Sequence, residues 1–123
     1  MKRKFTESEV EHLAHDIRRL LVKRGLWKSV TIFFNGVAVS TDDRNGHHAY
    51  NDAGKFFVFE NEDPRRYCEY AGGVLTMVYD GELYEAINYG MDPKMLREFV
   101  SLLSRYGTHY EFGHAWSLSV YPD

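Results

Sequence analysis

The stretch 30–41, VTIFFNGVAVST, constrains the fold more than any other part of the chain. Asn-Gly pairs favour the two positive φ angles of a type I′ turn, whose twist matches that of two paired strands. A two-residue turn at Asn35-Gly36 also sets the register, and it places Ile32 opposite Val39 on an apolar face of the sheet. The sequence therefore predicts an antiparallel hairpin with one buried face.

Two amphipathic helices are predicted to flank the strands. The first covers about residues 7–24 and begins at a capping box, in which the side chains of Thr6 and Glu9 satisfy each other's backbone amides. The second covers residues 93–106 and begins at Pro93, which suits a first helical turn because its φ angle is already helical. Apolar side chains recur at helical spacing in both segments, so each helix is expected to bury one face.

The other segments are rich in strand patterns. Strands are predicted at 55–60 and 73–80, and the alternation in 108–122 predicts a last hairpin that turns near Gly113. Strands joined by tight turns run antiparallel, and no repeated strand–helix–strand pattern is present. We therefore expect a single α+β domain over residues 1–123, with an antiparallel sheet of about five or six strands and two main helices packed on one face.

Segment 82–89 has two interpretations. Asp80-Gly81 suits a hairpin turn, which would make the segment a strand. Leu83 and Ile87, however, lie four residues apart and a glycine follows the segment, as at the end of a helix. The spacing favours a short helix.

Bulk properties limit the class of protein. The single cysteine, Cys68, excludes an intramolecular disulfide and favours a reducing compartment. The first residues, MKRKFTESEVEH, lack the apolar segment of a signal peptide, and no apolar run reaches the roughly eighteen residues of a membrane span. We therefore expect a soluble, cytoplasmic protein without a membrane segment.

The net charge of −3 conceals an asymmetry along the chain. Residues 1–28 hold eight Lys or Arg and four acids, whereas the remainder holds seven basic residues and fourteen acids. A nucleic-acid-binding protein usually has a basic total with aromatic residues among its cations. Here Lys2, Arg3 and Lys4 form only a short basic arm, so a nucleic-acid partner is not expected.

The polar stretch 41–52, TDDRNGHHAYND, resembles half of a calcium-binding loop. Gly46 fits the position of the sharp bend, and Asp43 then falls on the third ligand position. The first ligand position holds Thr41 instead of Asp, and the twelfth holds Asp52 instead of the bidentate Glu. A polar turn at Asn45-Gly46 explains the stretch without an ion, and it is the favoured interpretation.

His47 and His48 in the same stretch are candidates for metal binding or for general-base catalysis, together with Asp43. Neighbours in an extended segment point to opposite faces, so only one of the two histidines can face a given site. A metal-dependent hydrolase would therefore need partners from elsewhere. The side chains available for that role are Asp42, Asp43, His109 and His114.

Two further groups are expected to be structural. His12 and His15, with Asp16, have a spacing that suits zinc, but their helical phase places them on the solvent side. Cys68 lies beside two arginines, which would favour its thiolate, but no nucleophile motif surrounds it. We expect Cys68 to be an unreactive, half-buried residue.

Tyrosine is the most informative residue type for function, since the chain contains nine. Sheet proteins favour tyrosine in general, but here several lie among acids and glycines, and tyrosine is enriched at binding hot spots. The predicted contact residues are Tyr67, Tyr70, Tyr84, Glu85 and Tyr89.

No intact catalytic or cofactor motif is present, and no cofactor is expected. The sequence therefore favours a non-catalytic protein that docks stoichiometrically onto a protein partner, as inhibitors, immunity proteins and adaptors do. The alternatives are the metal-dependent hydrolase and a small-molecule-sequestering protein with a Tyr-lined pocket. Whether the protein is an enzyme stays open, and the sequence leans against it.

Overall fold

The computed structural model describes residues 4–123 and has an α+β fold. Lys2 and Arg3 of the predicted basic arm lie outside the described residues. The elements in chain order are α1 (Glu7–Lys23), β1 (Val30–Phe34), β2 (Val37–Ser40), β3 (Phe57–Phe59), the 3₁₀ helix η1 (Pro64–Arg66), β4 (Leu75–Tyr79), α2 (Gly81–Tyr89), α3 (Pro93–Arg105), β5 (Thr108–Phe112) and β6 (Ser117–Pro122).

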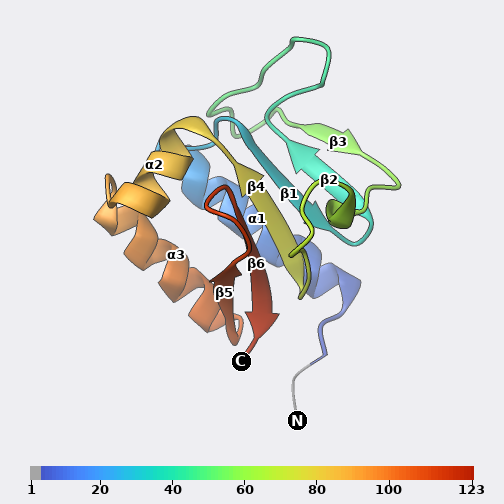
Figure 1. Cartoon of the computed structure of the whole chain (residues 1–123), viewed down its shortest axis with the longest axis vertical. Helices are drawn as coiled ribbons and strands as arrows, with labels where there is room; N and C mark the ends of the chain where they lie inside the picture. The colour runs from blue at the N-terminus through green and yellow to red at the C-terminus, as the bar shows by residue number, and fades with distance from the viewer. Residues whose placement is uncertain (1–3) are drawn as a thin grey trace.

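The strands form one antiparallel sheet of six, in the order β3-β2-β1-β4-β6-β5. Helices α1 and α3 pack together on one side of this sheet, and α2 connects β4 to α3 at one end (Figure 1). The predicted fold class is confirmed, with the larger of the two expected strand numbers. No helix within residues 4–123 is both long and apolar enough to cross a bilayer.

The hairpin of β1 and β2 forms as its turn sequence predicts. Asn35 and Gly36 have φ angles of 50° and 76°, the two positive values of the type I′ turn. The register pairs Ile32 with Val39 and places both in the core beneath the helices. Turn chemistry and apolar pattern therefore select the same register.

The helix ends also follow the sequence. Thr6 accepts a hydrogen bond from the Glu9 backbone amide at 3.1 Å, and the Glu9 carboxylate accepts one from the Thr6 amide, which completes the capping box. Segment 82–89 is helical: α2 starts after Asp80, which caps it, and stops at Gly90 in the left-handed conformation. The favoured interpretation of that segment is confirmed.

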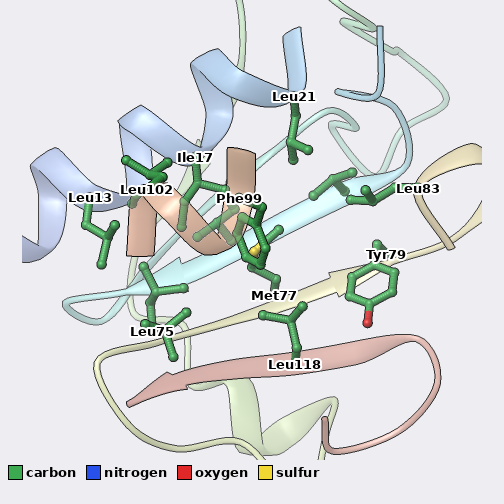
Figure 2. Close-up of a cluster of buried hydrophobic side chains, with 14 of the residues drawn as sticks. Leu13, Ile17, Leu21, Leu75, Met77, Tyr79, Leu83, Phe99, Leu102 and Leu118 are labelled. Carbon is green, nitrogen blue, oxygen red and sulfur yellow. The ribbon is translucent and has the colours of Figure 1, made fainter. Parts of the chain in front are cut away.

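The hydrophobic core lies between the two long helices and the sheet (Figure 2). Ile17 of α1, Phe99 of α3 and Met77 of β4 are each at most 2% exposed. Complete burial of side chains of this size contributes roughly 1.5–3 kcal/mol each. Every second residue of the central strands faces this core. The opposite face of the sheet is therefore the one that other segments can contact.

The face of the sheet away from the helices carries short and hydroxyl side chains. Thr76 of β4 and Ser119 of β6 share a hydrogen bond of 2.8 Å, and Ser117 accepts one from the Cys68 thiol at 3.3 Å. All four side chains are buried, so Cys68 is fully rather than half buried. Residues 60–73 lie over part of this face (Figure 1), and Phe33, on the second face of the first hairpin, is only 3% exposed. The hairpin therefore buries more than the one face that its sequence predicts.

Two predicted elements differ in extent. The strand expected at 55–60 is shorter, since only Phe57–Phe59 pair with β2, which leaves 41–56 as a long connection. The last hairpin has the loop 113–116 between its strands. Its position near Gly113 agrees with the sequence, and its residues become important at the site described below.

Gly73 contacts the backbone of β6. Its φ angle is +67°, and a Cβ atom there would lie 2.2 Å from the carbonyl oxygen of Val120. Gly90 has nearly the same φ angle, +66°, but a Cβ there would meet nothing within 4 Å. The two glycines therefore share a backbone conformation and differ in the space around them.

Gly73→Ala is expected to lower the free energy of unfolding by more than about 2 kcal/mol, because the left-handed conformation and the contact with Val120 both oppose a side chain. Gly90→Ala, which meets only the conformational penalty, should cost about 1 kcal/mol. Urea denaturation of both variants measures the difference. Equal losses would show that β6 accommodates the added methyl group without cost.

Candidate functional site

A pocket of about 500 Å³ opens on the face of the sheet away from α1 and α3. Its floor comes from the alternate residues of the central strands, including Thr31 and Phe33 of β1 and Val78 of β4. The complete lining is Ser29, Thr31, Phe33, Asp42, Arg44, Tyr67, Val78, Tyr79, Asp80, Tyr84 and Trp116. The pocket is open to solvent, and its lining combines five aromatic residues with three charged ones.

One wall is built around the buried carboxylate of Glu62. Its Oε1 accepts a hydrogen bond from Arg44 Nη1 at 2.7 Å, and its Oε2 accepts one from the Tyr67 hydroxyl at 3.0 Å. The hydrogen bond from Arg44 holds the pKa of Glu62 below its usual value and raises that of Arg44. The Arg44 guanidinium also lies 4.0 Å from the ring centre of Phe59. Arg44 and Tyr67 are therefore fixed relative to each other.

A second contact, with Phe33, also fixes the Tyr67 ring. Its ring stacks on Phe33 with centroids 5.4 Å apart, and Phe33 belongs to the sheet floor. Tyr67 nevertheless remains 46% exposed. A ring that is immobilised and yet exposed can contact a partner at little additional cost in side-chain entropy.

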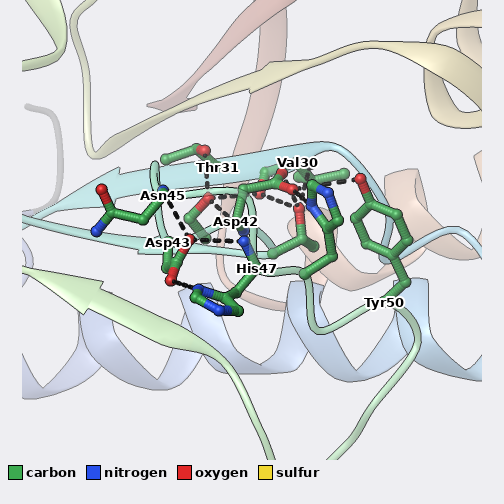
Figure 3. A network of polar contacts seen from close by, with 10 residues as sticks. Val30, Thr31, Asp42, Asp43, Asn45, His47 and Tyr50 are labelled. Carbon is green, nitrogen blue, oxygen red and sulfur yellow. Dashed lines mark hydrogen bonds and ion pairs between the residues drawn. The ribbon is translucent and has the colours of Figure 1, made fainter.

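Asp42 lines a second wall of the pocket and belongs to a network of polar contacts (Figure 3). The Asp42 carboxylate accepts hydrogen bonds from the Thr41 hydroxyl at 2.8 Å and from the Tyr50 hydroxyl at 3.2 Å, and Nδ1 of His48 contacts it directly. The His48 ring stacks on Tyr50 with centroids 4.9 Å apart. These contacts orient Asp42 at the edge of the pocket.

The neighbouring pair, Asp43 and His47, closes a tight turn. Asp43 accepts hydrogen bonds from the backbone amides of Asn45 and His47 at 2.7 and 2.9 Å, and the His47 ring nitrogen lies 2.5 Å from its other oxygen (Figure 3). Burial opposes ionisation, but the backbone donors prevail and the pKa of Asp43 is lowered. The polar-turn interpretation agrees with this geometry, although the positive φ angles fall at Arg44 and Gly46 instead of at Asn45.

The histidines do not gather at one point. His47 and His48 each pair with a different carboxylate, while His109 on the outermost strand β5 contacts Glu111 and Asp123. Within residues 4–123 no three His, Cys, Asp or Glu side chains are arranged to hold a metal ion. Metal-dependent hydrolysis therefore stays a prediction from the sequence alone.

His15 departs from the expectation of a solvent-side position. Its ring packs edge-on against Phe34 at 6.0 Å and lies 5.4 Å from Phe56. Burial, together with the nearby Arg18, lowers its pKa. The reason is that the long connection after β2 returns across this part of α1, which helical phase alone cannot reveal.

On one side of the pocket, a chain of contacting aromatic rings extends along the loop of the last hairpin. Trp116 lines the pocket and stacks on His114 with centroids 4.5 Å apart and planes 10° apart. His114 in turn contacts Tyr70, with centroids 4.9 Å apart. Tyr70 and Trp116 are 57% and 38% exposed.

On the other side the rings continue through α2. Tyr84 lines the pocket, and its ring centroid lies 6.1 Å from that of Tyr89, which is 70% exposed. The side-chain amide of Asn88 donates a hydrogen bond of 2.8 Å to the Ala115 carbonyl oxygen, which ties α2 to the last hairpin. We call the rings in and around the pocket the aromatic rim: the exposed Tyr67, Tyr70, Tyr89 and Trp116, and the partly buried Tyr84.

The structure brings together most of the predicted contact residues. Tyr67 and Tyr84 line the pocket, and Tyr70 and Tyr89 each lie at the outer end of a chain of contacting rings. Glu85 is exposed on α2 but does not line the pocket. These positions define a surface; whether it binds a partner stays a prediction.

Sequence reasoning did not select several residues that complete the site. The alternation in 108–122 predicts strands on both sides of a turn near Gly113, but Trp116 lies in the hairpin loop just before β6. Its place beside a pocket depends on contacts with segments more than thirty residues away along the chain. The missed lining residues with charged or aromatic side chains are Phe33, Arg44, Tyr79, Asp80 and Trp116.

Comparisons of this chain with protein-family models, with curated proteins and with solved structures give no match. The fold and the site are therefore interpreted from their own geometry.

The ion pair behind Tyr67 gives a pH-dependent prediction. Because the pKa of Glu62 is lowered in the folded protein, its contribution to stability is present above the ordinary glutamate value and is lost as pH falls through the lowered pKa. Glu62→Gln should lower the free energy of unfolding by about 1 kcal/mol at pH 7, since Arg44 is half exposed and partly screened.

The difference between wild type and Glu62→Gln should shrink as the pH falls below about 4, where the wild-type carboxylate becomes protonated. Urea titrations at a series of pH values measure it. Glu60→Gln, at an exposed position two residues away, is the control and should follow the wild type. A constant difference down to pH 2.5 would contradict the assignment of the effect to the charge of Glu62.

Proposed function

We propose that this protein is a non-catalytic binding protein that docks onto a protein partner through the pocket and its aromatic rim. The observation that supports this most is the set of exposed rings held in fixed positions around one pocket. Tyr67 is fixed by Phe33 and Glu62, and Trp116 is fixed by His114. Tyrosine and tryptophan dominate binding hot spots because a large ring buries much area with few rotatable bonds.

The exposure of the rim distinguishes it from ordinary packing of a sheet. A folded chain exposes scattered apolar side chains without consequence, but clustered ones usually mark an interaction site. Tyr70, Tyr89 and Trp116 come from three separate segments of the chain. Trp116 lines the pocket, and Tyr70 and Tyr89 are each connected to a lining residue by contacting rings. This clustering supports a role in recognition.

A second candidate is small-molecule sequestration, which the pocket volume favours. About 500 Å³ lies within the usual range of ligand pockets, roughly 300–1,000 Å³. Such pockets usually enclose most of their ligand, whereas this one is open and its rim continues onto the surface. The geometry therefore supports a protein partner better than an enclosed ligand.

The test compares capture of partners from a cell lysate by four forms of the protein: wild type, Tyr70→Ala, Trp116→Ala and Phe112→Ala. Phe112 is 51% exposed and contacts Tyr110, whose ring packs on Phe99 on the helix side of the sheet, so it is the matched control away from the pocket. Each rim substitution should weaken binding of the captured partner by at least tenfold, or about 1.4 kcal/mol, while Phe112→Ala leaves it unchanged.

The dissociation constants are measured by calorimetry on the purified partner. Capture of no partner, or of one bound equally by all four forms, would refute the docking proposal. A thermal-shift screen with small molecules tests the second candidate, because tight binding to the folded state raises its melting temperature. A compound that does so only when Trp116 is intact would favour sequestration.

A further inference from the structure

The geometry points to a cationic side chain, arginine or lysine, as the group that enters the pocket from the partner. This inference rests on the proposed docking function and specifies its chemistry. It is carried by the charges of the lining residues and by the faces of the aromatic rings that remain open to the pocket.

Arg44 is the one cation among the lining residues, and it is already neutralised. Its guanidinium donates to the buried Glu62 carboxylate at 2.7 Å and rests on the ring of Phe59. Recruiting Arg44 to an anionic guest would leave Glu62 buried without its cation, which is costly. The pocket is therefore unsuited to a phosphate or carboxylate guest.

Asp80 supplies the uncompensated negative charge. It caps α2 by accepting a hydrogen bond from the Gly81 amide at 2.8 Å, and within residues 4–123 no lysine or arginine pairs with it. The carboxylate also occupies the helix N-terminus, where an anion would otherwise bind. Asp42, on the second wall, adds a carboxylate whose one ion-pair partner within residues 4–123 is His48. The net field of the pocket attracts a cation.

The aromatic lining suits the same guest. His114 stacks on one face of Trp116, so the indole can present only its other face to the pocket. Tyr84 lies on the pocket lining next to Asp80, at the start of the same helix. A cation over an aromatic face gains roughly 0.5–1 kcal/mol at an exposed site and more when water is excluded.

Charge complementarity extends beyond the pocket. Segment 42–89, which supplies most of the lining, holds ten acids and four lysines or arginines. Such an excess steers a basic partner toward the site and disfavours an acidic one. A basic segment of a protein, with one arginine or lysine inserted between Asp80 and Trp116, is therefore the occupant that fits.

The experiment is an NMR titration of the ¹⁵N-labelled protein with N-acetyl-arginine methylamide. The uncharged probe, N-acetyl-citrulline methylamide, has nearly the same shape without the charge. The indole N–H signal of Trp116 should shift saturably with the arginine probe and not with the citrulline probe. The indole of Trp27, which is 0% exposed in the core, is an internal reference and should not move.

Asp80→Asn is the decisive variant because asparagine caps a helix as well as aspartate does but carries no charge. It should weaken binding of the arginine probe about threefold, the effect expected of one exposed charge pair. Asp92→Asn makes the same change at the cap of α3 and should leave binding unchanged. A circular-dichroism melt confirms that both variants are folded.

An equal response to both probes, or no response of Trp116, would overturn the cationic inference. If rim substitutions still abolish partner capture in that case, the docking proposal stands and the guest is not a cation. If the arginine probe binds as expected but no partner depends on the rim, the cation site stands and the docking proposal fails. The two proposals are thus separable.

Discussion

The arrangement of the molecule depends on how one sheet divides its two faces. Strand residues alternate, so when Ile32 and Met77 pack under α1 and α3, their neighbours Phe33 and Val78 must point the other way. Within residues 4–123 no α-helix packs on that second face. Segment 60–73 covers part of it, and the pocket occupies a part that remains open. The site is a consequence of helices packing on one side only.

Directional polar contacts fix the segment 41–74, which runs from β2 through β3 to β4. Arg18 of α1 is only 5% exposed; it donates to the Ala53 carbonyl oxygen at 2.9 Å and lies 4.4 Å from the ring centre of Phe56. The Glu62 amide donates to the Gly36 carbonyl oxygen, which attaches the segment to the first hairpin. Because polar contacts of this kind depend on direction, they position Arg44 and Tyr67 more narrowly than apolar packing would.

The sequence predicted the elements better than the site. The hairpin at Asn35-Gly36 and the capped helices depend on neighbours in sequence, so local patterns were sufficient. The pocket depends on Trp116 and Tyr84 lining the same cavity, an arrangement that only the completed sheet and the tie between Asn88 and the last hairpin create. Of the predicted contact tyrosines, Tyr67, Tyr70 and Tyr89 are exposed, whereas Tyr84 is partly buried against the core. Their role in binding stays a prediction. His15 was misplaced because its cover comes from a distant loop.

At such a site the aromatic rings and the charged groups would have different roles in recognising a partner. The rings are immobilised before any partner arrives, so contact with them costs little further entropy and they can supply most of the affinity. Charges near the surface are screened and contribute less to affinity, but they act over several ångströms and select the sign of the partner. Glu62 links the two roles, since by neutralising Arg44 and accepting from Tyr67 it fixes a ring and removes the one cation that would repel a basic guest. The carboxylates of Asp80 and Asp42 therefore set the sign of the pocket, because the buried Glu62 neutralises the cation of Arg44.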